Sequence, residues 1–219
     1  RLQAVRSSEG VSAVQLQRAP AAAPAPEDLA RADLYALVAS LMFAAPARDL
    51  LDAIGGARLL GEDAEGELRD AWQSLQSACR AADAGAVRQE FDDLFVGVGH
   101  PLVQPNASYY LAGFLNEAPL VELRERLAEL GFGRRPAVGE TEDHLSALAD
   151  VMRMLILGTG DGAGSELKAQ RRFFERFLKP WYARLAQDLA AAERADFYGV
   201  VGRFLKAFLD VETASFEMA

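Results

Sequence analysis

A short stretch in the middle of the chain, GETEDHLSAL, holds three carboxylates and one of the two histidines. All four lie within the five consecutive positions from Glu140 to His144. A carboxylate next to an imidazole is a combination that can hold a metal ion, transfer protons in catalysis, or bind a cationic partner. The residues available elsewhere in the chain, and the helix that follows the stretch, decide between these chemistries.

A metal site is the least favoured of the three. Zinc requires several His or Cys ligands, and this chain has only His100, His144 and Cys79. A carboxylate-bridged di-iron bundle requires Glu-x-x-His pairs on two helices. Glu140 and His144 are four residues apart and no second such pair exists. We therefore predict that the protein holds no metal and no other cofactor.

Acid and base catalysis competes with a purely structural interpretation. Thr141 is predicted to cap a helix, which places Glu142 and Asp143 in its first turn, where carboxylates are stabilised by the helix dipole. At about 100° per residue, Asp143 is expected to point outward and His144 to lie half buried at the edge of the apolar stripe. A histidine in that position is at least as often a structural hydrogen-bonding group as a catalyst. The residues alone leave both interpretations open.

The elements that must position these residues are helices. From Glu27 onward, apolar residues recur three and four positions apart almost everywhere, and no segment shows the sustained alternation of a strand. The clearest stripes are Leu34 to Met42, Leu68 to Cys79, Val87 to Phe95, Leu120 to Leu130, Leu145 to Ile156, Phe174 to Leu185 with a break at Pro180, and Phe197 to Phe208. We predict an all-α, single globular domain of many medium-length helices over residues 27–219, preceded by a flexible Ala/Pro-rich segment, 1–26.

Two connections are rich in glycine. The first, VGVGHPLVQPNAS from Val96 to Ser108, is long for a link between helices and is predicted to be a structured loop, a common location for function. The second, GTGDGAGS from Gly158 to Ser165, superficially resembles a phosphate-binding loop. It lacks the lysine of the Walker pattern and no strand precedes it, so we interpret it as a mobile linker.

Charge and hydropathy exclude several classes of partner. The formal net charge of -9 disfavours nucleic acid and anionic membrane surfaces and favours a cationic partner. No apolar run approaches the roughly 20 residues that cross a bilayer, and no secretory signal is recognisable. The single cysteine, Cys79, lies in an apolar stripe and rules out a disulfide within the chain. We predict a cytoplasmic protein without stable membrane insertion.

Several longer motifs follow one another in a fixed order: EFDDLFVG, PNASYY, ETEDHL with LADVMRMLI, FFERFLKPWYARL, and DFYGVVGRFLKAFLDVE. In this order, from about Arg31 to Glu212, they resemble the TorD/DmsD family of cytoplasmic chaperones for molybdenum-cofactor oxidoreductases. The resemblance implies a TorD-like helical fold and a chaperone, not an enzyme. Such a chaperone binds the precursor of a molybdoenzyme catalytic subunit, at its twin-arginine signal peptide or as the apo-enzyme, and assists cofactor insertion before export or assembly. The tail VETASFEM is similar to relatives that serve formate dehydrogenases.

The E-P-x-D-H signature of that family is matched at Glu140, Asp143 and His144. Thr141 replaces the usual proline, a change that a helix start tolerates because threonine also caps helices. The resemblance implies that the three matched residues bind the signal peptide, with Glu142 as an additional carboxylate. A cationic and then apolar peptide needs carboxylates beside a hydrophobic groove.

A second element of the family, P-x-x-S-x-Y, is matched at Pro105, Ser108 and Tyr110. Ala107 stands where many relatives have glutamate, which removes one carboxylate from the expected groove. The resemblance implies that these residues also belong to the partner-binding site. We expect the loop from Phe95 to Tyr110 to form an apolar wall of that site.

Two other classes of function remain as alternatives. A guanine-nucleotide-binding or hydrolysing protein is one, because such binding has been suggested within the family. A generic helical interaction domain, in which ETEDH is only a helix start, is the other.

Overall fold

The computed structural model describes residues 24–57, 66–97, 101–115, 118–133, 139–158 and 167–218. Over these residues the secondary structure is helical, as predicted, apart from one isolated bridge. The helices are α1 (Pro26–Phe43), α2 (Arg48–Gly56), α3 (Glu67–Ala81), α4 (Ala84–Phe91), the π-helical turn η1 (Asp92–Val96), α5 (Ala107–Ala112), α6 (Ala118–Glu129), α7 (Leu145–Leu157), α8 (Leu167–Phe177), α9 (Tyr182–Ala191) and α10 (Phe197–Met218).

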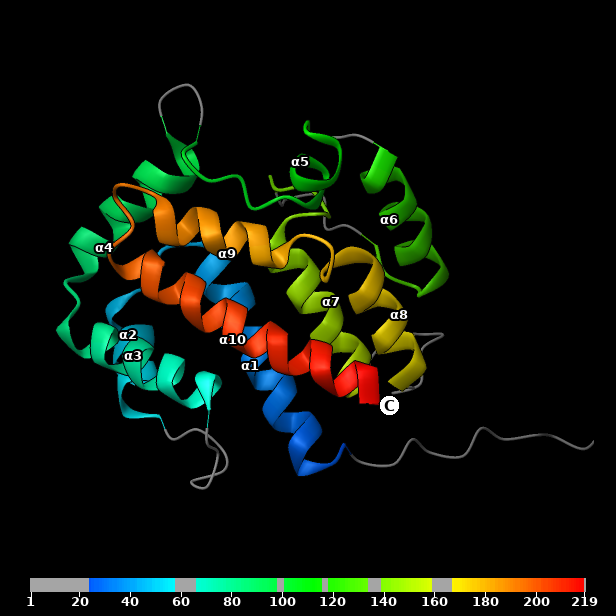
Figure 1. The fold of residues 1–219 in the computed structure, drawn as a ribbon, viewed down its shortest axis with the longest axis horizontal. Helices are drawn as coiled ribbons and strands as arrows, with labels where there is room; N and C mark the ends of the chain where they lie inside the picture. The colour runs from blue at the N-terminus through cyan, green and yellow to red at the C-terminus, as the bar shows by residue number, and fades with distance from the viewer. Residues whose placement is uncertain are drawn as a thin grey trace, which may run out of the picture.

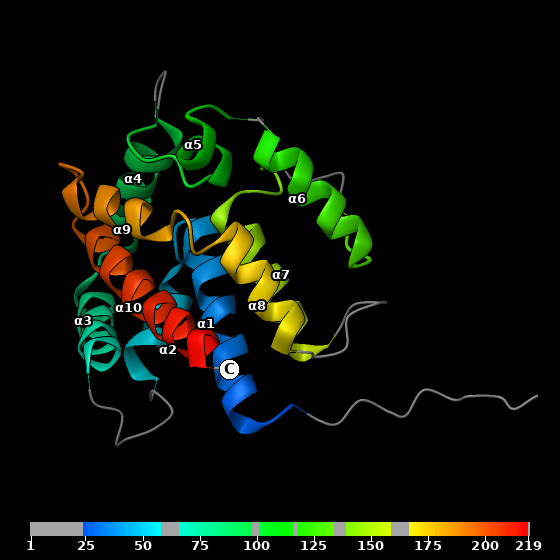
Figure 2. The same ribbon diagram turned by 45° about the vertical axis from the view of Figure 1, so that its right-hand side comes forward.

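The helices pack around two central contacts. Helix α1 lies along α7, and α10 lies between α9 and α3. Helix α2 packs on α3, α8 packs on α7, and the short α5 contacts α6. Figures 1 and 2 show α5 and α6 together at one end of the molecule. The segment 101–107 passes beside α9 and leads to α5 (Figure 1).

The apolar stripes of the sequence form the core. The largest fully buried side chains are aromatic and come from segments far apart in the chain, among them Tyr35, Trp181, Tyr198, Phe204 and Phe208. Tyr35 packs edge-on against Phe208 with ring centroids 4.9 Å apart, an arrangement that aromatic pairs favour. Most of the stability of these short helices therefore comes from tertiary packing.

A buried carboxylate joins the two ends of the fold. Glu212 of α10 is 1% exposed and accepts two hydrogen bonds of 2.8 Å from the Arg31 guanidinium of α1. The Tyr35 hydroxyl donates a third, at 3.0 Å. The Arg31 guanidinium also lies over the Phe216 ring. The charge of Glu212 is thus compensated, as a buried carboxylate requires.

Most predicted helix ends are confirmed. Helix α1 ends at Phe43, before Pro46, and Pro180 lies in the turn between α8 and α9. Gly131, with φ of 76°, follows α6 in the left-handed conformation that glycine adopts readily. Helices α2 and α5 were not predicted. Helix α5 begins inside the segment predicted as a loop, because six residues are too few to show a periodic pattern.

Two sequence predictions concern segments that lie mainly outside the described residues. The Ala/Pro-rich segment lies almost wholly outside the described residues, so the division at residue 26 stays a prediction. In the GTGDGAGS stretch, only Gly158 is described, and it ends α7 with φ of 67°. Among the described helices, none is both long enough and apolar enough to cross a bilayer.

Glycine allows α9 and α10 to approach closely. A Cβ atom on Gly202 would lie 2.9 Å from the Leu189 Cβ and 3.3 Å from the Ala186 carbonyl oxygen. The first distance is shorter than Cβ contacts allow, and the second is tighter than most of them. At Gly199, one turn earlier on the same helix, the closest atom to a new Cβ would be 3.9 Å away.

We therefore expect Gly202→Ala to lower the free energy of unfolding by about 1–3 kcal/mol, the usual range for overpacking. Gly199→Ala is the matched control and should leave stability unchanged or raise it, because alanine favours helix more than glycine does. Urea denaturation measures both. Equal effects of the two substitutions would show that the α9–α10 contact is not tight.

Candidate functional site

The two short family motifs meet at the Asp143 carboxylate. The backbone N–H and the hydroxyl of Ser108 donate to its Oδ2, at 2.9 and 2.5 Å. The amide of Asn106 and the hydroxyl of Thr141 donate to its Oδ1, at 3.2 and 2.5 Å. Asp143 is 1% exposed. Four donors therefore satisfy a carboxylate that is closed off from solvent.

Backbone hydrogen bonds reinforce this junction. The Ala107 N–H donates to the Asp143 carbonyl at 3.0 Å, and the Leu145 N–H donates to the Pro105 carbonyl at 2.8 Å. These two bonds make Asn106 and His144 the partners of an isolated antiparallel β-bridge. The start of α5 and the start of α7 are thus held together, although 35 residues separate Ser108 from Asp143 in the chain.

The predicted orientation of Asp143 was wrong. Helix α7 begins at Leu145, with His144 as its N-cap, so Asp143 precedes the helix and does not belong to its first turn. The outward direction was predicted from the rotation of about 100° per helical residue, which does not apply to a residue before the helix. The Asp143 side chain instead points to Ser108. Burial raises the pKa of Asp143, but the hydrogen bonds from Ser108, Thr141 and Asn106 outweigh burial and hold the pKa below its ordinary value.

His144 is more deeply buried than predicted and serves as a cap. It is 6% exposed, and its Nδ1 accepts the Ser146 N–H at 3.2 Å. The Ser146 hydroxyl lies 2.7 Å from the same nitrogen. Burial lowers the pKa of His144, although the charges of Glu140 and Asp143 act in the opposite direction. A neutral imidazole that caps α7 explains this residue without catalysis.

Tyr110 fastens α5 to α9. Its hydroxyl donates to Asp188 at 2.6 Å, and its ring stacks on Trp181 with centroids 5.4 Å apart. The Arg184 guanidinium lies over the ring and donates to the Tyr110 carbonyl. Burial, followed by the bond to Asp188, raises the pKa of Tyr110. The tyrosine of the motif is therefore a structural clamp with little surface of its own.

The remaining predicted residues are divided between surface and core. Glu140 is exposed, and Glu142 is half-buried and forms an ion pair of 2.9 Å with Arg124 of α6. Pro105 is buried. Phe95 is half-buried and packs edge-on against Tyr198 of α10, with centroids 5.1 Å apart. Phe95 thus packs on α10 and does not join the residues around Asp143.

The exposed apolar residues around α5 lie partly inside the predicted wall from Phe95 to Tyr110, which includes Leu102 and Tyr109. The sequence did not single out Phe114 and Leu115, which lie beyond it. Leu102 is 58% exposed and Phe114 is 71% exposed, and Tyr109 and Leu115 are exposed as well. Adjacent helical residues point in different directions, so the buried Tyr110 leaves its neighbour Tyr109 facing outward. The pair of tyrosines was the signal for this surface. Within the described residues, no group of three or more His, Cys, Asp or Glu side chains could hold a metal ion.

We expect Asp143→Asn to lower the free energy of unfolding by about 2–4 kcal/mol. The amide nitrogen of asparagine is itself a donor, and it would face N–H and O–H groups whose hydrogen bonds the carboxylate now accepts. Glu140→Gln removes the same charge from the same segment at an exposed position, and should change stability by less than about 0.5 kcal/mol. Chemical denaturation distinguishes the two. If Asp143→Asn left the free energy of unfolding unchanged, the carboxylate would not be what holds this junction together.

The depressed pKa of His144 predicts a pH effect. Between the folded-state pKa and about pH 6.5, the unfolded chain binds more protons at this site, so stability falls as the pH drops below about 6.5. His144→Asn keeps an N-cap acceptor and removes the titration. The difference in unfolding free energy between wild type and variant should shift against the wild type from pH 7 to pH 5. A constant difference over this range would contradict the assignment.

Comparisons with known proteins agree with this architecture. A family model described as the nitrate reductase delta subunit matches residues 62–187. A protein named Chaperone protein TorD from Aliivibrio salmonicida (strain LFI1238) is 26% identical over 130 residues, 56% of this chain and 60% of the relative. Another of that name, from Psychrobacter sp. (strain PRwf-1), is 30% identical over 124 residues, 54% of this chain and 56% of the relative. The chain thus spans less than two thirds of the length of these curated relatives.

A solved structure supports the fold. A crystal structure described as a redox enzyme maturation protein from Archaeoglobus fulgidus aligns with a TM-score of 0.56 at 18% identity, over 91% of this chain and 99% of the other. The likeness at this identity concerns the fold. The family model covers more than half of the 219 residues and includes both motifs that meet at Asp143. The chain belongs to the nitrate reductase delta subunit family of TorD-like proteins.

Proposed function

We propose that this protein is a non-enzymatic cytoplasmic chaperone for the precursor of a molybdoenzyme catalytic subunit. It binds the twin-arginine signal peptide and assists the client until the cofactor has been inserted. Family membership and the name of the curated relatives support the chaperone function. The observation that carries the proposal is the buried Asp143 junction, which holds an exposed apolar and acidic surface in place.

That surface, which we call the α5 surface, consists of Tyr109, Phe114, Leu115, Glu140 and Glu142. The first three belong to α5 and the turn after it, and the two carboxylates belong to the segment that is hydrogen-bonded to the start of α5. Several exposed apolar side chains on one short segment, here 109–115, are typical of a protein-binding surface. The buried residues Asp143, His144, Pro105, Ser108 and Tyr110 join α5 to the start of α7 and to α9, and we propose that they support this surface.

The chemistry of the α5 surface suits a peptide that is cationic and then apolar. The exposed carboxylate of Glu140 is available to a guanidinium, and Phe114 and Tyr109 offer apolar area to the residues that follow. The net charge of -9 attracts a cationic segment before contact. Because the junction beneath the surface is already formed, binding does not require its ordering.

A formate dehydrogenase is the client that we propose first, since the C-terminal tail is similar to relatives that serve such enzymes. The tail forms the end of α10, where Glu212 and Phe216 are buried in the core. Val211 and Met218 are the exposed apolar residues of this end. Contacts with the client would involve those two side chains and not the buried ones.

Binding of a synthetic peptide with two arginines followed by an apolar stretch tests the proposal. Fluorescence anisotropy should show affinity that falls as salt rises from about 0.05 to 0.5 M, with a remainder from apolar burial. Phe114→Ser should weaken binding about tenfold, because a large apolar contact is lost. Phe43→Ser, an exposed phenylalanine at the end of α1, is the matched control and should have no effect. If the affinity for the peptide changed neither with salt concentration nor in Phe114→Ser, the proposal would be refuted.

A further inference from the structure

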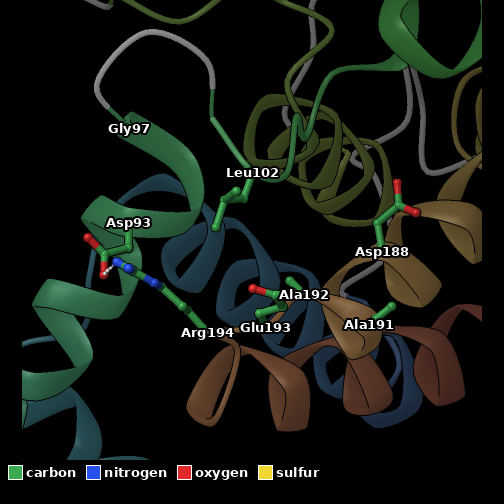
Figure 3. A pocket seen from close by; sticks show the side chains of 8 residues that line it. All are labelled: Asp93, Gly97, Leu102, Asp188, Ala191, Ala192, Glu193 and Arg194. Atoms are coloured by element: carbon green, nitrogen blue, oxygen red, sulfur yellow. Dashed lines mark hydrogen bonds and ion pairs between the residues drawn. The ribbon is translucent and has the colours of Figure 1, made fainter.

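A pocket of about 690 Å³ lies between η1, the segment that carries Leu102, and the end of α9 (Figure 3). Its lining residues are Asp93, Gly97, Leu102, Asp188, Ala191, Ala192, Glu193 and Arg194. Figure 3 shows Leu102 extending from its loop toward the end of α9, with Asp93 and Asp188 on opposite sides. The hydroxyl of Tyr110 donates to Asp188, so the pocket adjoins α5.

The charges around this pocket favour a cation. Three lining residues are carboxylates, Asp93, Asp188 and Glu193, and one is a cation, Arg194. The C-terminal end of α9, which carries Ala191, adds the negative end of a helix dipole. The apolar lining residues other than Leu102 are the small Gly97, Ala191 and Ala192, which leaves room for an extended side chain beside Leu102.

Within the protein, an arginine already shows how Asp93 binds a guanidinium. Arg194 donates to the Asp93 Oδ2 at 2.8 Å, while the Gln89 amide donates to its Oδ1 at 2.9 Å. Gln89 thus fixes the carboxylate independently of Arg194. The side chain of Arg194 is 65% exposed, and ion pairs with so much exposure contribute little stability. Another arginine could take its place at small cost.

We propose that this pocket binds one arginine side chain of the partner peptide, which displaces Arg194 from Asp93. This inference rests on the proposed function and gives it a second contact beyond the α5 surface. The incoming guanidinium pairs with Asp93, its charge is further stabilised by Asp188 and Glu193, and its methylene groups pack on Leu102. A peptide that continues past Asp188 and Tyr110 reaches the α5 surface.

Peptide binding to three variants tests this inference. Asp93→Asn removes the carboxylate that receives the arginine and should weaken binding of the two-arginine peptide about tenfold. Arg194→Ala removes the internal competitor and should strengthen binding about two- to threefold. Asp52→Asn is the matched control, since Asp52 also forms an exposed ion pair with an arginine, Arg48, but lies on α2. Thermal melting of each variant verifies that it is folded.

The outcomes separate this inference from the proposed function. If the peptide fails to bind the wild-type protein, both are overturned. If it binds, and Phe114→Ser weakens it while Asp93→Asn and Arg194→Ala behave like Asp52→Asn, only the pocket is refuted. Replacing each arginine of the peptide by lysine in turn should weaken binding to the wild type, because lysine lacks the planar fork. For the peptide arginine that enters the pocket, the replacement by lysine should no longer weaken binding when the protein carries Asp93→Asn.

Discussion

The arrangement at the α5 end of the molecule depends on the buried carboxylate of Asp143. It joins a segment with almost no secondary structure, 101–106, and the start of α5 to the start of α7. A buried charge is costly unless donors surround it, and here Ser108, Thr141 and Asn106 provide them. The same donors need an acceptor once they are buried, so each side of the junction stabilises the other.

This junction assigns roles to the residues of the two family motifs. Asp143 is a buried acceptor, His144 caps α7, and Tyr110 is the clamp to α9. We propose that these residues support a binding surface. Phe114 and Glu140, by contrast, are exposed, and the proposed function assigns the contact with a partner to them. A binding surface that rests on a fully hydrogen-bonded layer is preorganised, and it loses little conformational entropy when a partner binds.

The sequence predicted the helical architecture because long amphipathic stripes and breakers such as Pro180 and Gly131 are local signals. It could not predict the direction of Asp143. That direction depends on where α7 begins, and the Leu145 N–H is bonded to the carbonyl of Pro105, which lies 40 positions earlier in the chain. The order of the motifs identified the family but not which residues face inward. Of the exposed apolar residues around α5, Phe114 and Leu115 were missed, because a six-residue helix has no period that shows how it continues.

Chemical-shift mapping of the wild-type protein with a peptide of two arginines and an apolar stretch tests the account most directly. The amide signals of Tyr109, Phe114 and Glu140 should move as peptide is added. The amide of Ser108, bonded to the buried Asp143 carboxylate, should stay protected from solvent exchange throughout. Shifts confined to the α2–α3 side, or loss of Ser108 protection on binding, would contradict the claim that a rigid buried junction presents the binding surface.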